Sequence, residues 1–79
     1  MVKGGFMSEI KMEKVVSSNI LEIGYDKESQ TLRVKFTNQT VYDYFGVQIE
    51  TYRQLKASAS VGKFFRQLIK GVYAFKKVW

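Results

Sequence analysis

The sequence contains no cysteine and no histidine, and both absences narrow the chemistry that this protein can perform. Without cysteine, neither a disulfide nor a thiolate metal site can form, which is consistent with a reducing compartment. Without histidine, the chain lacks the commonest general base and the commonest ligand of transition metals. The remaining residues show no evident pairing of a base with a nucleophile. We therefore expect a protein that is not an enzyme and that has no metal site and no cofactor.

Long apolar runs are also missing from the 79 residues. No stretch approaches the roughly 20 apolar residues of a membrane-spanning helix, and the N-terminus lacks the continuous apolar core of a signal peptide. We therefore expect a cytoplasmic protein with no membrane contact. The first dozen residues have no periodicity, so the sequence predicts a flexible segment over residues 1–13 and a single domain over residues 14–79.

Acidic side chains are absent from residues 51–79, although seven basic side chains occur there. Such segregation of charge bears on the choice of partner more than on the fold, and it favours an anionic partner. The alternative is that these residues only keep a small basic protein soluble on a solvated helix face. The seven positions are Arg53, Lys56, Lys63, Arg66, Lys70, Lys76 and Lys77.

Three segments alternate apolar and polar residues in the pattern of half-buried strands, and they span residues 20–25, 31–37 and 40–45. In the first segment, Leu21, Ile23 and Tyr25 share one face. The short polar connections between the segments are typical of antiparallel hairpins. The sequence therefore predicts a three-stranded antiparallel β-meander with one buried face and one solvated face.

The periodicity becomes helical after Gly46, where apolar residues recur every three to four positions. This spacing predicts a short helix over residues 49–57 and a second helix capped by the Ser60 hydroxyl, with Gly71 as its natural stop. Both helices should pack on one face of the sheet, which gives an α+β fold. The basic tail over residues 72–79 either adds a short strand or stays irregular. The apolar stripe of the second helix comprises Val61, Phe64, Phe65, Leu68 and Ile69.

The direction of Tyr42 and Tyr44 depends on the length of the turn that precedes them. A two-residue turn places both tyrosines beside Arg33 and Lys35 on the solvated face, as a surface suited to stacking single-stranded bases. A turn with an odd number of residues places them in the core and turns Asp43 outward beside the basic residues. Burying an unpaired carboxylate costs several kcal/mol, whereas an exposed cross-strand ion pair gains about 0.2 to 1 kcal/mol, so we favour the second register.

Several short motifs, taken in order, make the chain similar to a known domain family. They are VSSNI at residues 16–20, IGYD at 23–26, TLRVKF at 31–36, YDY at 42–44, GV at 46–47 and YRQLKASASVGKFF at 52–65. In this order and spacing they resemble the KTSC domain. That family is named for a small module at the C-terminus of some lysyl-tRNA synthetases, and it also occurs as free-standing bacterial and phage proteins. The resemblance covers about residues 14–75.

The resemblance implies a compact α+β domain for which RNA binding is the proposed role, with the family's Tyr-x-Tyr motif at Tyr42 and Tyr44. Two positions depart from the family pattern, and they bear on the turn type and on the start of the first helix. Gln39 replaces the glycine that usually follows the second strand, and Gln48 replaces the proline that usually follows Gly-Val. The connection with tRNA belongs to the members that are fused to a synthetase.

We interpret the sequence as that of a small non-enzymatic module that binds nucleic acid, with RNA favoured over DNA. The seven basic side chains would contact phosphates, and Tyr42 and Tyr44 would stack on bases or form hydrogen bonds to them. The alternative is a protein-interaction module, for example a phage- or prophage-encoded inhibitor whose basic face meets an acidic protein surface or occupies a nucleic-acid-binding site. Both hypotheses depend mainly on Lys63, Arg66 and Lys70, which the apolar pattern places on the outer side of the second helix.

Overall fold

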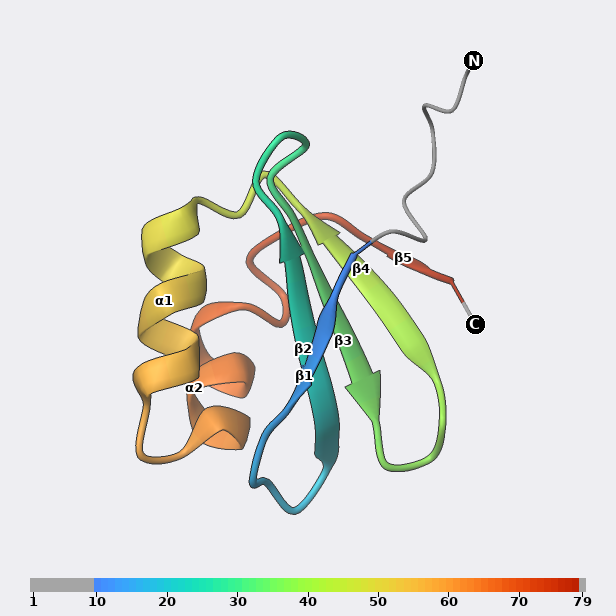
Figure 1. Ribbon diagram of the computed structural model, residues 1–79, viewed down its shortest axis with the longest axis vertical. Coiled ribbons are helices and arrows are strands. Elements are labelled where there is room, and N and C mark those ends of the chain that lie inside the picture. The colour runs from blue at the N-terminus through green and yellow to red at the C-terminus, as the bar shows by residue number, and fades with distance from the viewer. Residues whose placement is uncertain (1–9, 79) are drawn as a thin grey trace.

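The computed structural model describes residues 10–78, which form an antiparallel sheet with two helices on one of its faces (Figure 1). Within these residues, five strands follow one another across the sheet in the order of the sequence, from β1 at one edge to β5 at the other. The arrangement confirms the α+β class. The elements are β1 (Met12–Lys14), β2 (Ile20–Asp26), β3 (Thr31–Phe36), β4 (Val41–Phe45), α1 (Ile49–Ala57), α2 (Val61–Leu68) and β5 (Phe75–Lys77).

The predicted three-stranded meander corresponds to β2, β3 and β4, and the structure adds one strand at each edge. At one edge β5 pairs with β4, so the C-terminal tail adopts the first of its two expected conformations. At the other edge, the sequence pattern does not predict β1, because this strand is short and shows no clear alternation. Met12 and Glu13 belong to β1, although they fall in the segment expected to be flexible. Residues 1–9 of that segment lie outside the described residues.

The β3–β4 hairpin has the register that turns Tyr42 and Tyr44 toward the helices. Tyr44 pairs with Leu32, which is fully buried. The Gln39 N–H donates a hydrogen bond to the Phe36 carbonyl at 2.8 Å, and Gln39 has a φ of 76°. Glycine adopts this left-handed conformation more readily than glutamine does. The register confirms the favoured interpretation, in which the turn has an odd number of residues.

Asp43 and Arg33 form a bidentate ion pair on the opposite face of the sheet. The Nε and Nη2 atoms of Arg33 donate to the two carboxylate oxygens of Asp43 at 2.7 and 2.9 Å. The expected solvation of this pair is wrong, because Asp43 is only 5% exposed and the Arg33 side chain 12%. In the neighbouring strand Gly24 pairs with Arg33, and the side chains of Ile10 and Met12 lie against that glycine. The first described residues therefore cover part of the face expected to be wet.

A β-bulge in β2 changes which of its residues enters the core. Ile20 pairs with Phe36 and Glu22 pairs with Lys35, so Leu21 is an extra residue in this strand. The bulge directs Ile20 into the core, whereas Leu21 is only partly buried. The expected core position of Leu21 is therefore wrong, because a bulge interrupts the strict alternation on which the prediction depends.

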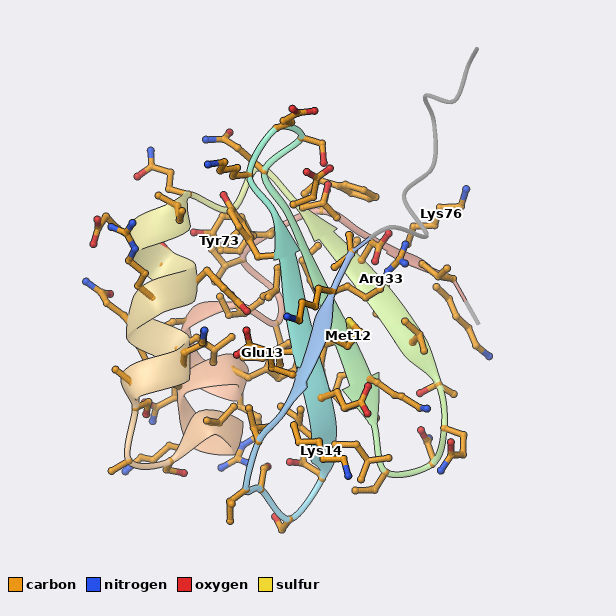
Figure 2. The ribbon with its side chains drawn as sticks, in the orientation of Figure 1. Met12, Glu13, Lys14, Arg33, Tyr73 and Lys76 are labelled. Atoms are coloured by element: carbon orange, nitrogen blue, oxygen red, sulfur yellow. The ribbon has the colours of Figure 1, made fainter. Side chains whose placement is uncertain are left out.

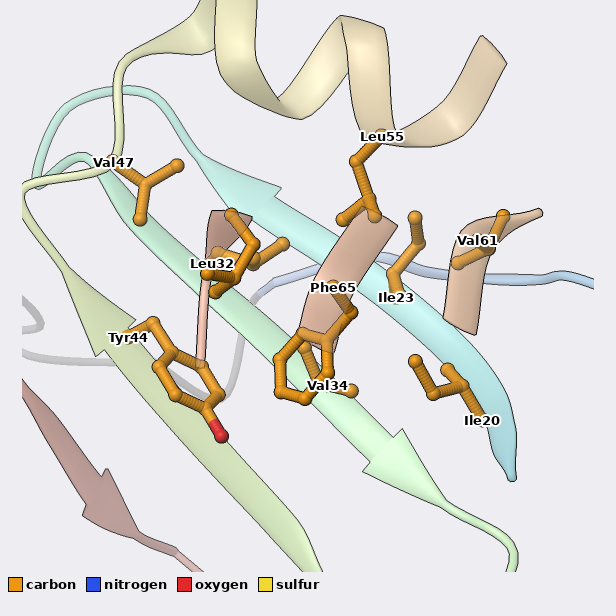
Figure 3. Close-up of a cluster of buried hydrophobic side chains, with 10 residues drawn as sticks. Ile20, Ile23, Leu32, Val34, Tyr44, Val47, Leu55, Val61 and Phe65 are labelled. Atoms are coloured by element: carbon orange, nitrogen blue, oxygen red, sulfur yellow. The ribbon is translucent and has the colours of Figure 1, made fainter. Parts of the chain in front are cut away.

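The hydrophobic core lies between the sheet and the two helices (Figure 3). Leu55 comes from α1, Val61 and Phe65 come from α2, and Ile69 follows α2 directly. The expectation for Leu68 is wrong, since this side chain is 50% exposed. At about 100° per residue, Leu68 lies roughly 60° from the centre of the three buried positions and therefore at the edge of the buried stripe.

The two helices begin where the sequence predicts. Gln48 precedes α1, whose bounds agree with the expected residues 49–57. The Ser60 hydroxyl accepts a hydrogen bond from the Lys63 N–H at 3.3 Å, which confirms the cap of α2. After α2 the chain turns at Gly71, where φ is 81°, and then returns to the sheet as β5.

Candidate nucleic-acid interface

A groove with a volume of about 600 Å³ opens on the helix-covered face of the sheet, near the end of α2, the β3–β4 turn and β5. Its lining combines aromatic, polar and basic side chains and includes no acidic residue. This combination suits a ligand that carries both flat apolar groups and negative charge. The lining residues are Asn19, Phe36, Thr37, Asn38, Thr40, Tyr42, Tyr44, Phe65, Arg66, Lys70, Gly71 and Phe75.

Five of these residues form an aromatic cluster: Phe36, Tyr42, Tyr44, Phe65 and Phe75. The pairing of β4 with β5 builds one half of it, because Tyr44 and Phe75 are directly opposed and their ring centroids are 5.8 Å apart. Tyr42 joins the two halves, with its centroid 5.9 Å from that of Phe36 and 5.8 Å from that of Phe75. Helix α2 completes the cluster, because its Phe65 ring packs edge to face against Tyr44 with the ring centroids 5.3 Å apart.

The aromatic cluster is buried at one end and open at the other. Tyr44 is 4% exposed and belongs to the core, Tyr42 is half-buried, and Phe75 is 59% exposed. Neither tyrosine hydroxyl has a hydrogen-bond partner among residues 10–78. Since no buried polar side-chain atom in these residues lacks a partner, both hydroxyls reach the surface of the groove. Burial raises the pKa of Tyr44, so its hydroxyl stays protonated at neutral pH.

Arg66 and Lys70 supply the positive charge of the groove. Both are exposed, and neither forms an ion pair with any residue in the described range 10–78. Their spacing of four residues places them on one side of α2 and of the turn that follows it. Lys63 lies on the same side of α2 and is exposed, but it does not line the groove. Two of these three predicted residues, Arg66 and Lys70, are therefore brought to the groove.

The two basic residues of α1 lie outside the groove and have intramolecular partners. Arg53 Nη1 is 2.8 Å from a carboxylate oxygen of Glu50, in an exposed pair. Lys56 Nζ is 3.0 Å from Glu13 of β1 and 5.4 Å from the centroid of the Tyr52 ring. The hydrogen bond to Glu13 raises the pKa of Lys56 and keeps it charged. Neither side chain joins the groove that Arg66 and Lys70 line.

Lys76 and Lys77 lie on opposite faces of the sheet. Lys77 pairs with Tyr42 and therefore shares the face that contains the groove. Lys76 pairs with Asp43 and shares the face of the Arg33 ion pair (Figure 2). The pairing of β5 thus gives the two adjacent lysines different surroundings.

The sequence interpretation missed the aromatic partners of the two tyrosines. Phe36 appears there only within the expected strand over residues 31–37, and Phe75 only within a tail with two possible conformations. Asn19 and Asn38 also line the groove without having been singled out. The signal for Phe75 is its alternation with Lys76 in a short edge strand, which becomes informative only when β5 is known to pair with β4.

Two further findings concern metal ligands and helix length in the described residues. Nowhere in residues 10–78 do three or more acidic, histidine or cysteine side chains gather closely enough to hold a metal ion. Neither described helix has the length and apolar character needed to cross a membrane.

Comparisons with known proteins identify one family. The family model of the KTSC domain matches residues 16–73. A KTSC domain protein from Yersinia pestis has a crystal structure that superposes with a TM-score of 0.86 at 34% sequence identity, covering 89% of this chain and 99% of that one. A protein from Tsukamurella paurometabola is 37% identical over 59 residues, which cover 75% of this chain and 88% of the relative. A lysine–tRNA ligase from Trichormus variabilis is 32% identical over 65 residues, or 82% of this chain and 12% of the ligase.

Proposed function

This chain belongs to the KTSC domain family, and from that premise we propose that it is a small, non-enzymatic RNA-binding module. The observation that carries the proposal is the juxtaposition of Arg66 and Lys70 with the open end of the aromatic cluster. Cations without an intramolecular partner contact phosphates, while aromatic faces contact bases. Binding rather than catalysis is proposed because the lining of the groove includes no carboxylate, imidazole or thiol.

The charge of the C-terminal part supports an anionic partner. Residues 51–79 carry seven basic side chains and no acidic one. Two of them, Arg53 and Lys56, have acidic partners within the domain, and Lys76 lies on the opposite face of the sheet. We therefore assign the phosphate contacts first to Arg66 and Lys70, with Lys63 and Lys77 flanking the groove, and the remaining three residues add long-range attraction.

The relatives favour RNA over DNA as the partner. Several lysine–tRNA ligases contain a segment similar to this chain, and the name of these enzymes states that they act on tRNA. The chain spans 12% of the length of the first of these ligases, so their reaction is not assigned to it. From these relatives we take only RNA as the class of partner, and we propose that the protein binds it in the cytoplasm.

Titration of a fluorescent single-stranded RNA tests the proposal. Four contacts, from Lys63, Arg66, Lys70 and Lys77, predict that log K falls with log salt at a slope of about −3. Affinity should then drop about 50-fold between roughly 50 and 200 mM salt. Lys70→Glu should weaken binding strongly, whereas Lys27→Glu, the same charge change in the exposed β2–β3 turn, should have a small effect.

Two results would contradict RNA binding as a function. One is an affinity no tighter than that of an unrelated protein of equal size and net charge. The other is equal weakening by Lys70→Glu and Lys27→Glu, which would show that only the total charge matters. A DNA oligonucleotide of the same sequence, titrated in parallel, tests the preference for RNA.

A second candidate function, the binding of an acidic protein segment, is favoured by the free edge of β5. The Ala74 carbonyl accepts from the Phe45 N–H and the Val78 N–H donates to the Val41 carbonyl, so these groups face β4. By strand alternation, the backbone groups of Phe75 point away from β4, and within residues 10–78 no strand pairs with them, so they can accept an added strand. An inhibitor, phage- or prophage-encoded for example, could use this edge. Nuclease-resistant capture of one acidic protein, lost on replacing Phe75 with proline, would support this candidate.

A further inference from the structure

The groove contains more than a phosphate-binding protein needs, because its floor is aromatic and partly open. Phosphate contacts alone require only exposed cations. Phe75 nevertheless keeps 59% of its surface exposed in a strand of three residues, next to the half-buried Tyr42. The two rings are tilted by 47° with centroids 5.8 Å apart, so they do not cover one another's faces.

We propose that this groove is a subsite for one unpaired nucleotide of single-stranded RNA. The base stacks on the exposed ring of Phe75 and contacts Tyr42 beside it, and the adjoining phosphate lies between Arg66 and Lys70. The inference rests on the proposed function and deepens it, because it names single-stranded RNA as the ligand and one groove as the place where a base is held. A volume of about 600 Å³ is within the usual range for sites that enclose small organic groups.

Polar groups around the aromatic floor are suited to the edges of a base. The hydroxyls of Tyr42 and Tyr44 have no hydrogen-bond partner in the described part of the chain, and each can donate or accept. The Asn38 side-chain oxygen is held by the N–H and hydroxyl of Thr40 at 3.1 and 2.6 Å. Asn19 is oriented in a similar way, since its side-chain oxygen accepts from the Ser17 hydroxyl at 3.1 Å. Neither amide NH₂ group has a partner within residues 10–78, so each can donate to a ligand.

The same geometry argues against a duplex and against a peptide in the groove. Bases within a duplex are stacked on their neighbours and cannot present a face to Phe75, whereas unpaired bases can. A peptide strand would pair with the outer edge of β5, which no other strand of the described range covers. The groove instead lies on the face of the sheet, where the strand backbones are already paired with one another. A flat ring with an attached anion fits the groove better than either.

A pair of matched variants tests the stacking contact. Phe75→Leu removes the flat ring and keeps an apolar side chain, and it should weaken binding of octauridylate by roughly 5- to 150-fold. Phe45→Leu is the control: Phe45 is also an exposed aromatic residue, at 39%, but its pairing with Thr31 places it on the opposite face of the sheet. This variant should bind octauridylate as the wild type does. Binding of an RNA duplex of matched length should be unchanged in both variants.

Because Phe75→Leu could disturb β5, a second experiment tests the same contact in the wild-type protein. Titration with uridine 5′-monophosphate, followed by NMR of the aromatic side chains, should shift the ring resonances of Phe75 and Tyr42. The ring of Phe45 should show no shift. Inorganic phosphate should leave all three rings unshifted, because it has no base to stack.

The possible results separate the subsite from the proposed function. If octauridylate and the duplex bind equally well and Phe75→Leu binds both as the wild type does, the nucleotide subsite is refuted while RNA binding stands. If neither RNA binds more tightly than to a control protein of equal charge, the proposed function fails and the subsite fails with it. If an acidic peptide binds and its contacts map to the edge of β5, the protein-interaction candidate replaces both.

Discussion

Replacing Asp43 with asparagine should destabilise the domain by about 3 kcal/mol, because the change removes one partner of a desolvated ion pair. Arg33 and Asp43 are joined by hydrogen bonds of 2.7 and 2.9 Å. At a separation of about 3 Å and an effective dielectric constant of about 20, two unit charges attract by about 5 kcal/mol. Desolvation offsets part of this attraction, and breaking a buried pair typically costs about 3 to 5 kcal/mol. The side chains are 12% and 7% exposed, so we expect the lower end of that range.

Urea denaturation followed by circular dichroism measures this loss. A decrease of about 3 kcal/mol should lower the melting temperature of a domain of this size by roughly 12 to 24 °C. Asparagine keeps the shape of Asp43, so the loss reports on charge more than on packing. A double-mutant cycle with Arg33→Met isolates the coupling between the two residues from any other contact of Arg33. The double variant Arg33→Met, Asp43→Leu should recover part of the stability, since no charge then stays buried.

An exposed pair on α1 provides the control. Arg53 and Glu50 are 2.8 Å apart, but their side chains are 64% and 67% exposed. Glu50→Gln should therefore cost less than about 0.5 kcal/mol. If Asp43→Asn costs no more than Glu50→Gln, the pair on the sheet is not desolvated, and our account of that face is wrong.

Four further predictions concern the core, the edge strand, a helix cap and alkaline pH. Phe65→Ala should cost about 3 to 5 kcal/mol in urea denaturation, because the ring packs between α2 and the sheet; a loss below about 1 kcal/mol would contradict this packing. Gly24→Ala should cost about 1 to 3 kcal/mol and speed amide exchange in β1, since a Cβ there would be 2.6 Å from the Lys11 carbonyl oxygen; unchanged exchange would contradict the close approach. Ser60→Ala should cost about 1 kcal/mol through loss of the α2 cap, and an unchanged urea midpoint would show that the cap contributes nothing. Burial raises the pKa of Tyr44, so the unfolded chain loses this proton first, and stability should be constant below about pH 9 and fall above about pH 10. Tyr44→Phe should reduce that fall, and a fall of unchanged size would show that other groups cause it.

Local patterns predict most of the secondary structure because they act over a few residues. The spacing of apolar residues predicts α1 at its observed bounds, and the position of Ser60 predicts the cap of α2. The β3–β4 register is also predicted correctly, because the sequence places Asp43 beside Arg33 on the face opposite the core. The expected exposure of that pair is wrong, since Asp43 is only 5% exposed. Leu21 and Leu68 are the exceptions. A bulge displaces the first, and the second lies at the edge of the buried stripe.

The candidate site is predicted only in part. The sequence indicates Arg66, Lys70, Tyr42 and Tyr44 as possible contact residues, but it cannot show that these four line one groove. Phe75 is the residue that sequence reasoning cannot assign, because the tail that contains it has no decisive pattern of its own. Its place in the groove depends on the pairing of β5 with β4, which joins segments far apart in the sequence.

The sequence by itself determined where apolar residues alternate as in strands and where they recur as in helices. It also determined the positive charge of residues 51–79 and the absence of thiol and imidazole side chains. These properties depend on composition and on neighbours along the chain. Only the tertiary structure decided that the Arg33–Asp43 pair is buried, that Lys76 and Lys77 face opposite ways and that an aromatic groove lies beside Arg66. Burial and shared surfaces depend on what covers a residue, and the covering groups come from strands and helices far apart in the sequence.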